Sequence, residues 1–112
     1  MGLQVLPLNP FFFPDTYLIG PEIWLGTHTN TSLEDQEGAH GDRASGRIKP
    51  SLLEARRSIR APCQPVVKKG SVIIRDLRLW HGGKPNLTQE PRVMLAMSKS
   101  PLFFLLLIFL SR

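Results

Sequence analysis

The sequence predicts a mainly β chain with one short helix. Ten prolines and nine glycines in 112 residues favour strands and turns over long helices. Apolar residues have helical spacing at 51–60, whereas the apolar runs at 72–79 and 93–97 have the length of strands. The chain is long enough for at most one small domain with a modest core.

The first half of the chain is expected to contain two short strands and a loop. Residues 2–6 form a short edge strand, because prolines at 7, 10 and 14 prevent any regular continuation. Residues 22–28 alternate in polarity and include a tryptophan, which predicts a second strand. Residues 29–50 are polar and contain three glycines, which is typical of a surface loop.

The single helix is predicted at residues 51–60. Ser51 and Glu54 form a capping-box pattern, and prolines at 50 and 62 mark the two ends. One face would carry apolar side chains and pack, and the other would be basic and solvated. The apolar face comprises Leu52, Ala55 and Ile59, and the basic face comprises Arg56, Arg57 and Arg60.

Two further strands are predicted around a glycine-rich loop. Residues 72–79 are apolar on both faces apart from Arg75, Asp76 and Arg78, as in a strand that is covered on both sides. His81 closes this strand, and Arg92 opens the next one, which continues to residue 97. Antiparallel pairing of these two strands is the simplest topology.

Charge is distributed unevenly along a chain whose net charge is +5. Residues 1–42 contain six acids and no Lys or Arg, and residues 43–112 contain all fourteen basic residues. A basic half suits an acidic ligand such as a dicarboxylate, a phosphorylated thioester or nucleic acid. Nucleic acid is not expected, because the basic stretch from residue 43 to 60 contains no aromatic residue that could stack on bases.

Cysteine content and the two termini indicate an intracellular, cytoplasmic protein. Cys63 is the only cysteine, so no internal disulfide forms and a reducing compartment is the simpler expectation. The N-terminus has no basic region of the kind that begins a signal peptide. The apolar run 101–110 is shorter than the ~20 residues that span a bilayer, so membrane association is not expected.

His81 and Arg92 are the candidate functional residues. If their strands are neighbours, a metal ligand and a carboxylate-binding cation lie at the same end of both. Each residue also has a simpler interpretation. His81 could be a hydrogen-bonded or surface histidine, and Arg92 could be a strand-end arginine in solvent.

The segment around these residues resembles a known family. Gly70-Ser71, an apolar strand ending in Leu79-Trp80-His81, the loop Gly82-Gly83-Lys84-Pro85-Asn86 and then Pro91-Arg92 are similar to the metal-site signature of the phytanoyl-CoA dioxygenase family. The resemblance covers residues 20–97 and is strongest over 70–97. It implies the C-terminal part of the family's catalytic domain.

The resemblance implies a fold, two cofactors and a reaction. The fold would be a partial double-stranded β-helix, that is, a jelly roll of the cupin type. The cofactors would be Fe(II) and, as cosubstrate, 2-oxoglutarate, and the reaction would oxidise (hydroxylate) a small organic substrate. His81 matches the family's distal iron-binding histidine, and Arg92 matches the arginine that binds the far carboxylate of 2-oxoglutarate.

The other two iron ligands of the family form a His-x-Asp pair. His40 and Asp42 have this spacing, and residues two apart project to the same side of a strand, so they could chelate. They follow the segment 26–28, whereas the family's pair precedes it, and they have glycine neighbours. His40 and Asp42 are therefore second-choice candidates, and the expected pair lies upstream of Met1.

These observations give one main expectation and two alternatives. Residues 1–97 would be a partial oxygenase domain and residues 98–112 an unrelated apolar tail, in a truncated product that is inactive alone. The first alternative is a non-catalytic basic β-rich module that binds an anionic partner. The second is a non-functional product whose apolar tail causes aggregation or membrane association.

Overall fold

The computed structural model describes residues 3–6, 17–38, 46–99 and 104–110. Strands make up most of the regular structure in these ranges, together with one α-helix and two 3-10 turns. All strand pairs are antiparallel. The predicted class, mainly β with one short helix, is confirmed.

The largest sheet has four strands in the order β1-β5-β8-β7. Its members are β1 (Leu3–Leu6), β5 (Val72–Asp76), β8 (Phe104–Leu110) and β7 (Val93–Lys99). β1 lies at an edge of the sheet, as predicted, and pairs with β5 through partners such as Val5 and Ile73.

The predicted direct pairing of the strands at 72–79 and 92–97 is wrong. β8 lies between them, with Ile73 opposite Leu107 on one side and Leu95 opposite Ile108 on the other. Residues 104–110 are all Phe, Leu or Ile, a continuous apolar run of the kind found in central strands. Because β5 and β7 are both antiparallel to β8, they run parallel to each other. The expected boundary between residues 1–97 and an apolar tail at 98–112 stays a prediction.

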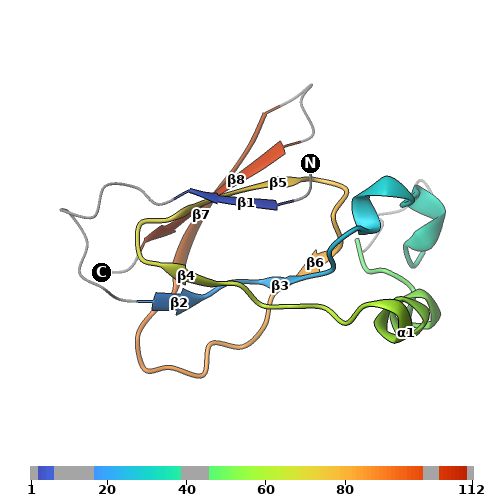
Figure 1. The fold of residues 1–112 in the computed structure, drawn as a ribbon, viewed down its shortest axis with the longest axis horizontal. Coiled ribbons are helices and arrows are strands. Elements are labelled where there is room, and N and C mark those ends of the chain that lie inside the picture. The colour runs from blue at the N-terminus through green and yellow to red at the C-terminus, as the bar shows by residue number, and fades with distance from the viewer. Residues whose placement is uncertain (1–2, 7–16, 39–45, 100–103, 111–112) are drawn as a thin grey trace.

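Two small sheets form a second layer (Figure 1). One pairs β2 (Tyr17–Ile19) with β4 (Val66–Lys68), and the other pairs β3 (Glu22–Ile23) with β6 (His81–Gly82). The core between the layers is built from Leu18 of β2, Val67 of β4 and Ile73 of β5, with Leu3 packed against them. Burial of these apolar side chains holds the layers together.

The predicted strand at 22–28 is too long. β3 ends at Ile23, and Gly26 then turns the chain with a φ of +88°, a left-handed conformation that favours glycine. The 3-10 turn η1 (Thr27–Thr29) follows directly. The expected loop at 29–50 contains a second 3-10 turn, η2 (Leu33–Asp35), and an isolated bridge between Gln36 and Ile48.

The predicted helix is present as α1 (Pro50–Ile59), but its cap differs from the prediction. Pro50 occupies the first turn, where its fixed φ and missing N–H are tolerated. Ser51 therefore lies inside the helix, and the N-cap residue Lys49 makes no side-chain cap bond. A capping box does exist, at η2, where Ser32 and Asp35 bond each other's backbone.

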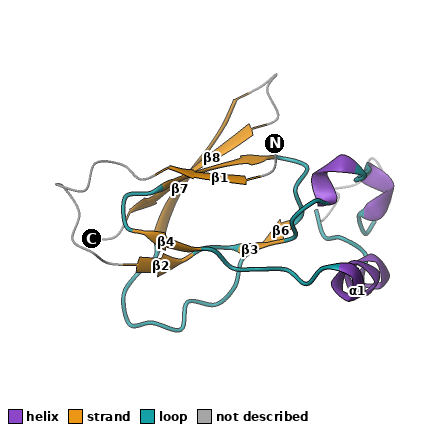
Figure 2. Cartoon of the chain, in the orientation of Figure 1, coloured by secondary structure: helices purple, strands orange, loops and turns teal. Residues whose placement is uncertain are grey.

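The predicted division of α1 into a packed apolar face and a solvated basic face is wrong. None of its residues is buried, and Ile59 is 75% exposed. Two arginines attach the helix instead. Arg56 donates from Nη2 to the carbonyl oxygen of Leu25, and the Arg57 guanidinium lies 5.1 Å from the centre of the Trp24 ring. The helical elements gather at one end of the strands (Figure 2).

Within the described ranges, no helix has the length and apolar character needed to cross a membrane.

Candidate functional site

The sequence suggested that His81 closes the strand that became β5. His81 instead opens β6. β5 ends at Asp76, and residues 77–79 form a turn in which Leu79 N–H donates to the carbonyl oxygen of Asp76 at 3.1 Å. The Asp76 carboxylate stabilises this turn by accepting the backbone N–H of Arg78 at 2.8 Å. His81 then pairs with Ile23 of β3, so it belongs to the second layer.

A salt bridge strengthens the same turn. Arg78 donates from Nε to Oδ1 of Asp76 at 3.0 Å and from Nη2 to Oδ2 at 2.7 Å. This bidentate contact is the largest cause that lowers the pKa of Asp76 to about 2. The carboxylate therefore stays charged at neutral pH, and the turn before His81 is fixed.

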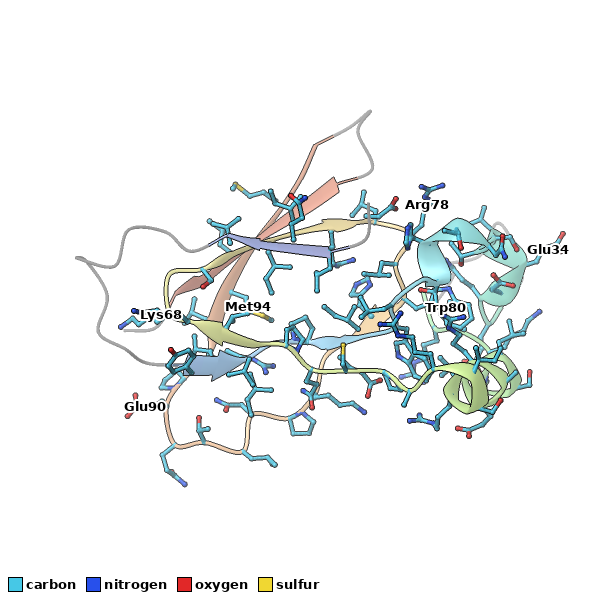
Figure 3. The ribbon with its side chains drawn as sticks, in the orientation of Figure 1. Glu34, Lys68, Arg78, Trp80, Glu90 and Met94 are labelled. Carbon is cyan, nitrogen blue, oxygen red and sulfur yellow. The ribbon has the colours of Figure 1, made fainter. Side chains whose placement is uncertain are left out.

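Trp80 is held from several directions. Its backbone N–H donates to Oγ1 of Thr27 at 2.8 Å, and its indole Nε1–H donates to Oγ1 of Thr31 at 2.7 Å. Its carbonyl oxygen accepts the N–H of Trp24 at 2.9 Å, and the two indole rings meet edge to face at 6.5 Å. Figure 3 shows Trp80 at the end of the molecule where the 3-10 turns and α1 lie.

The imidazole of His81 has two neighbours at one nitrogen. Nδ1 lies 2.9 Å from the carbonyl oxygen of Leu79 and 3.1 Å from Nη1 of Arg75. A neutral ring that donates Nδ1–H to Leu79 leaves the lone pair of Nε2 free. A ring that accepts from Arg75 carries its proton on Nε2 instead. The tautomer therefore decides whether Nε2 can bind a metal.

The surroundings of His81 favour its neutral form. The residue is exposed by surface area, but its Nδ1 edge lies against Arg75 and Leu79. Loss of water around the ring lowers the pKa of His81, the Arg75 charge lowers it further, and the bond to Leu79 opposes both. A neutral imidazole is the form that ligates metal ions.

Arg75 is a buried cation in the strand that precedes this site. Its exposed fraction is 3%, and burial lowers its pKa from the ordinary value. Residues two apart share one face of a strand, so Arg75 lies on the face of β5 that carries the core residue Ile73. Its Nε has no hydrogen-bond partner among the described residues. Its one described side-chain bond is the contact with His81.

Arg92 is bound to backbone oxygens. Nη1 donates to the carbonyl of Ile19 at 2.8 Å, and Nη2 donates to the carbonyl of Lys84 at 3.0 Å. These bonds tie the loop after β6 to the end of β2. The simpler expectation of a strand-end arginine in solvent does not hold, because the residue is half-buried.

The expectation that His81 and Arg92 lie on neighbouring strands is wrong. β8 separates β5 from β7, and His81 itself sits in β6. None of the hydrogen bonds found in the described ranges joins the two side chains. The side chain that contacts His81 is instead that of Arg75, whose Nη1 lies 3.1 Å from Nδ1 of the ring.

The loop between His81 and Arg92 has its own supports. Asn86 donates from Nδ2 to the carbonyl of Glu90 at 2.6 Å and accepts from the backbone N–H of Thr88 at 3.2 Å, so its side chain stabilises this loop. Lys84 forms a 2.9 Å ion pair with Glu22 of β3. The loop is thus attached to the second layer at both ends.

Two clefts share His81 and Trp80 in their walls. Their volumes are about 370 Å³ and about 380 Å³. The first extends toward Thr31 and Arg78, and the second toward Glu22 and Trp24. Clefts of this size can bind a small organic molecule.

The described residues do not complete a metal site. A non-haem iron site needs two histidines and one carboxylate on one face. No group of three His, Cys, Asp or Glu side chains in the described ranges could hold a metal ion. His81 offers one ligand there, and His40 and Asp42 lie outside the described residues.

Arg75, Thr27 and Thr31 are site residues that the sequence reasoning did not select. A signal existed for Arg75, because strand alternation places it on the same face as Ile73. The two threonines carry no comparable signal, since they meet Trp80 only through chain segments 53 and 49 residues apart.

Comparison with known proteins identifies the family. No solved structure matches the chain. The family model described as phytanoyl-CoA dioxygenase matches residues 21–94, about two thirds of the chain. This match spans β3, α1, β5, β6 and the start of β7, and it indicates dioxygenase, and so oxidoreductase, chemistry. The family is generally dependent on Fe(II) and 2-oxoglutarate. The chain therefore belongs to the phytanoyl-CoA dioxygenase family.

Proposed function

We propose that the chain carries part of an Fe(II)- and 2-oxoglutarate-dependent oxygenase site, in which His81 binds the metal and Arg92 binds the far carboxylate of 2-oxoglutarate. One observation carries the proposal. Within the segment that matches the family, Nδ1 of His81 lies 2.9 Å from a backbone carbonyl, that of Leu79. Metal-binding histidines almost always donate their second ring N–H to such an acceptor.

The neighbours of His81 support a ligand role. Donation to Leu79 fixes the ring and leaves Nε2 with a free lone pair, while the lowered pKa keeps the ring neutral. Trp80 supports the backbone next to it through its bonds to Thr27 and Thr31. A ligand on a fixed backbone loses little conformational entropy when the metal binds.

Arg92 is suited to a carboxylate by its chemistry and its fixed position. Its guanidinium is always charged and can bind two carboxylate oxygens at once. The carbonyls of Ile19 and Lys84 already orient the side chain, so 2-oxoglutarate would approach a preorganised cation. The position of Arg92, eleven residues after His81, is the one that the family signature assigns to this role.

The remaining ligands would come from outside the described residues. We infer that the described sheets belong to a double-stranded β-helix and to the C-terminal part of the family's domain, with residues 98–112 as a tail. His40 and Asp42 stay second-choice candidates for the other two ligands. Bound iron and 2-oxoglutarate would supply the oxidising chemistry for a small organic substrate. Because one ligand holds iron weakly, we expect the 112 residues to be inactive alone.

A metal titration tests the role of His81. Co(II), a redox-stable substitute for Fe(II), is added to the protein, and the histidine ring signals are followed by NMR. We expect the His81 signals to respond first, and His81→Ala to remove the response. His28→Ala is the matched control, because His28 belongs to η1 and is not a proposed ligand. A response that survives in His81→Ala would refute the ligand role.

Binding of 2-oxoglutarate tests Arg92. Calorimetry with Arg92→Met should show weaker binding by about 10- to 100-fold, the range for loss of a charged hydrogen-bonded pair. Arg60→Met removes the same charge from the exposed residue that follows α1 and should bind normally. Salt-sensitive binding to heparin, with no response to Co(II) or 2-oxoglutarate, would favour the basic anion-binding module instead.

A further inference from the structure

We propose that Arg75 is a second carboxylate-binding residue of this chain, which holds a small carboxylate beside His81. The inference deepens the proposed function, because the reason for placing a carboxylate there rests on His81 as a metal ligand. It concerns a residue other than Arg92, since Arg75 lies in β5 and Arg92 directly precedes β7.

The Arg75 side chain is buried, and one of its donors is unused within the described ranges. The residue is 3% exposed, and Nε has no partner in the described part of the chain. Arginines are almost never fully buried unless an anion pairs with them. Among the described residues, this buried guanidinium with an unused N–H therefore lacks the anion that its position requires.

No acidic side chain among the described residues pairs with Arg75. Asp76 is the adjacent carboxylate in the sequence, but Arg78 binds both of its oxygens. Successive residues of a strand face opposite sides, so Asp76 also lies on the other face of β5. The described ion pairs join other residues, such as Lys84 with Glu22 and Arg57 with Glu54.

The position of the proton on His81 decides whether the ring can accept a hydrogen bond from Arg75. If Nε2 binds a metal, Nδ1 carries the proton and donates to Leu79. Nη1 of Arg75, 3.1 Å away, then faces an N–H and has no acceptor on the ring. Metal binding thus leaves Arg75 with two donors that need an acceptor, Nε and Nη1.

A carboxylate is the anion that fits these donors. The guanidinium is a planar fork that matches two oxygens of a planar anion. His81 lines both clefts, so a small molecule in either cleft can reach the histidine that Arg75 touches. The carboxylate could belong to a 2-oxo acid or to an organic acid substrate, and the experiment separates these sources.

The test observes the side-chain Nε–H of Arg75 by NMR in metal-free protein. Pyruvate offers a 2-oxo group and one carboxylate, whereas succinate offers two carboxylates and no 2-oxo group. Ionic strength is held constant with sodium chloride. We expect the Nε–H signal to shift on addition of at least one of them. A shift with pyruvate assigns the site to 2-oxo acids, and a shift with succinate alone assigns it to other organic acids.

Variants separate binding from a structural role. Arg75→Met keeps a similar length and removes the charge, and it should weaken binding of the active carboxylate by about 10- to 100-fold. Arg60→Met is the charge-matched control and should bind normally. If Arg75→Met does not fold, Arg75→Lys keeps the charge but loses the fork, and it should bind more weakly than the unmodified protein.

Two results would overturn the inference. One is an Arg75 Nε–H signal that neither carboxylate moves. The other is carboxylate affinity that is unchanged in the folded Arg75 variant. Failure of the proposed function gives a different pattern, because His81→Ala would leave Co(II) binding unchanged and Arg92→Met would leave 2-oxoglutarate binding unchanged. Pyruvate binding that depends on Arg75 and not on Arg92 would support two separate sites.

Discussion

The side-chain oxygen of Thr27 accepts the backbone N–H of Trp80 at 2.8 Å and donates to the carbonyl of Trp24 at the same distance. Thr27 is 6% exposed, so this hydroxyl joins the 3-10 turn η1 to the residue before His81 inside the protein. A buried N–H that loses its acceptor costs free energy, because water cannot replace it. The hydroxyl therefore supports the position of His81.

Thr27→Val should lower the free energy of unfolding by about 1–3 kcal/mol, since the N–H of Trp80 is left without an acceptor. Val has nearly the same shape as Thr, so the loss reports the hydroxyl. Urea unfolding followed by tryptophan fluorescence measures it. Thr27→Ser keeps the hydroxyl and should cost less. Equal losses in the two variants would mean that packing of the methyl group, and not the bond to Trp80, is important.

Gly26→Ala should destabilise the protein by about 1–2 kcal/mol, the usual cost of a side chain in a left-handed conformation. The φ of Gly26 is +88°, and an added Cβ would lie 2.7 Å from Nη2 of Arg56. Gly83→Ala is the control, because its Cβ would have no neighbour within 4 Å. Thermal unfolding of both variants compares them. A Gly83→Ala protein as unstable as Gly26→Ala would contradict this explanation.

Arg56→Met should loosen α1. Nη2 of Arg56 donates to the carbonyl of Leu25, and none of the helix residues is buried, so this bond is a main attachment of the helix. We expect a loss of about 1–2 kcal/mol in the free energy of unfolding. If Arg56→Met speeds amide exchange across α1 and not in β5, the loss of stability lies in the attachment of the helix. Arg60→Met removes an equal charge and should change stability by no more than about 0.5 kcal/mol.

Local signals explain which elements the sequence predicted well. The helix was found because Pro50 and Pro62 mark its ends within a few residues of the apolar pattern. The strand predicted at residues 72–79 was found, although β5 ends at Asp76, because its apolar run is preceded by a glycine turn. The sequence could not predict that Arg56 faces Leu25, because the partner lies 31 residues away and the helical pattern placed Arg56 on the solvated face.

Strand pairing and the site depend on contacts between distant segments. The predicted pairing of β5 with β7 was wrong because β8, formed by the apolar run at 104–110, lies between them. His81 was predicted at the end of a strand, but Asp76 caps a turn that carries it into the second layer. The family signature found the residues around His81. It did not reveal that Nε of Arg75 is buried without a hydrogen-bond partner among the described residues.

Stability should fall as the pH is lowered from about 4 to about 2. The salt bridge with Arg78 lowers the pKa of Asp76 to about 2 in the folded chain. In the unfolded chain an aspartate has a pKa of about 3.9. The folded state therefore binds the proton less readily, and the stabilisation is complete above the unfolded pKa and lost as pH falls through the folded one.

Asp76→Asn should remove this part of the pH dependence and lower the free energy of unfolding at pH 7 by about 1–2 kcal/mol, because the charged bonds to Arg78 are lost. Arg78→Gln removes the partner and should flatten the same pH range. Urea unfolding at several pH values between 2 and 7 measures both variants. An Asp76→Asn protein with an unchanged dependence on pH would show that other carboxylates, and not the turn before His81, control acid unfolding.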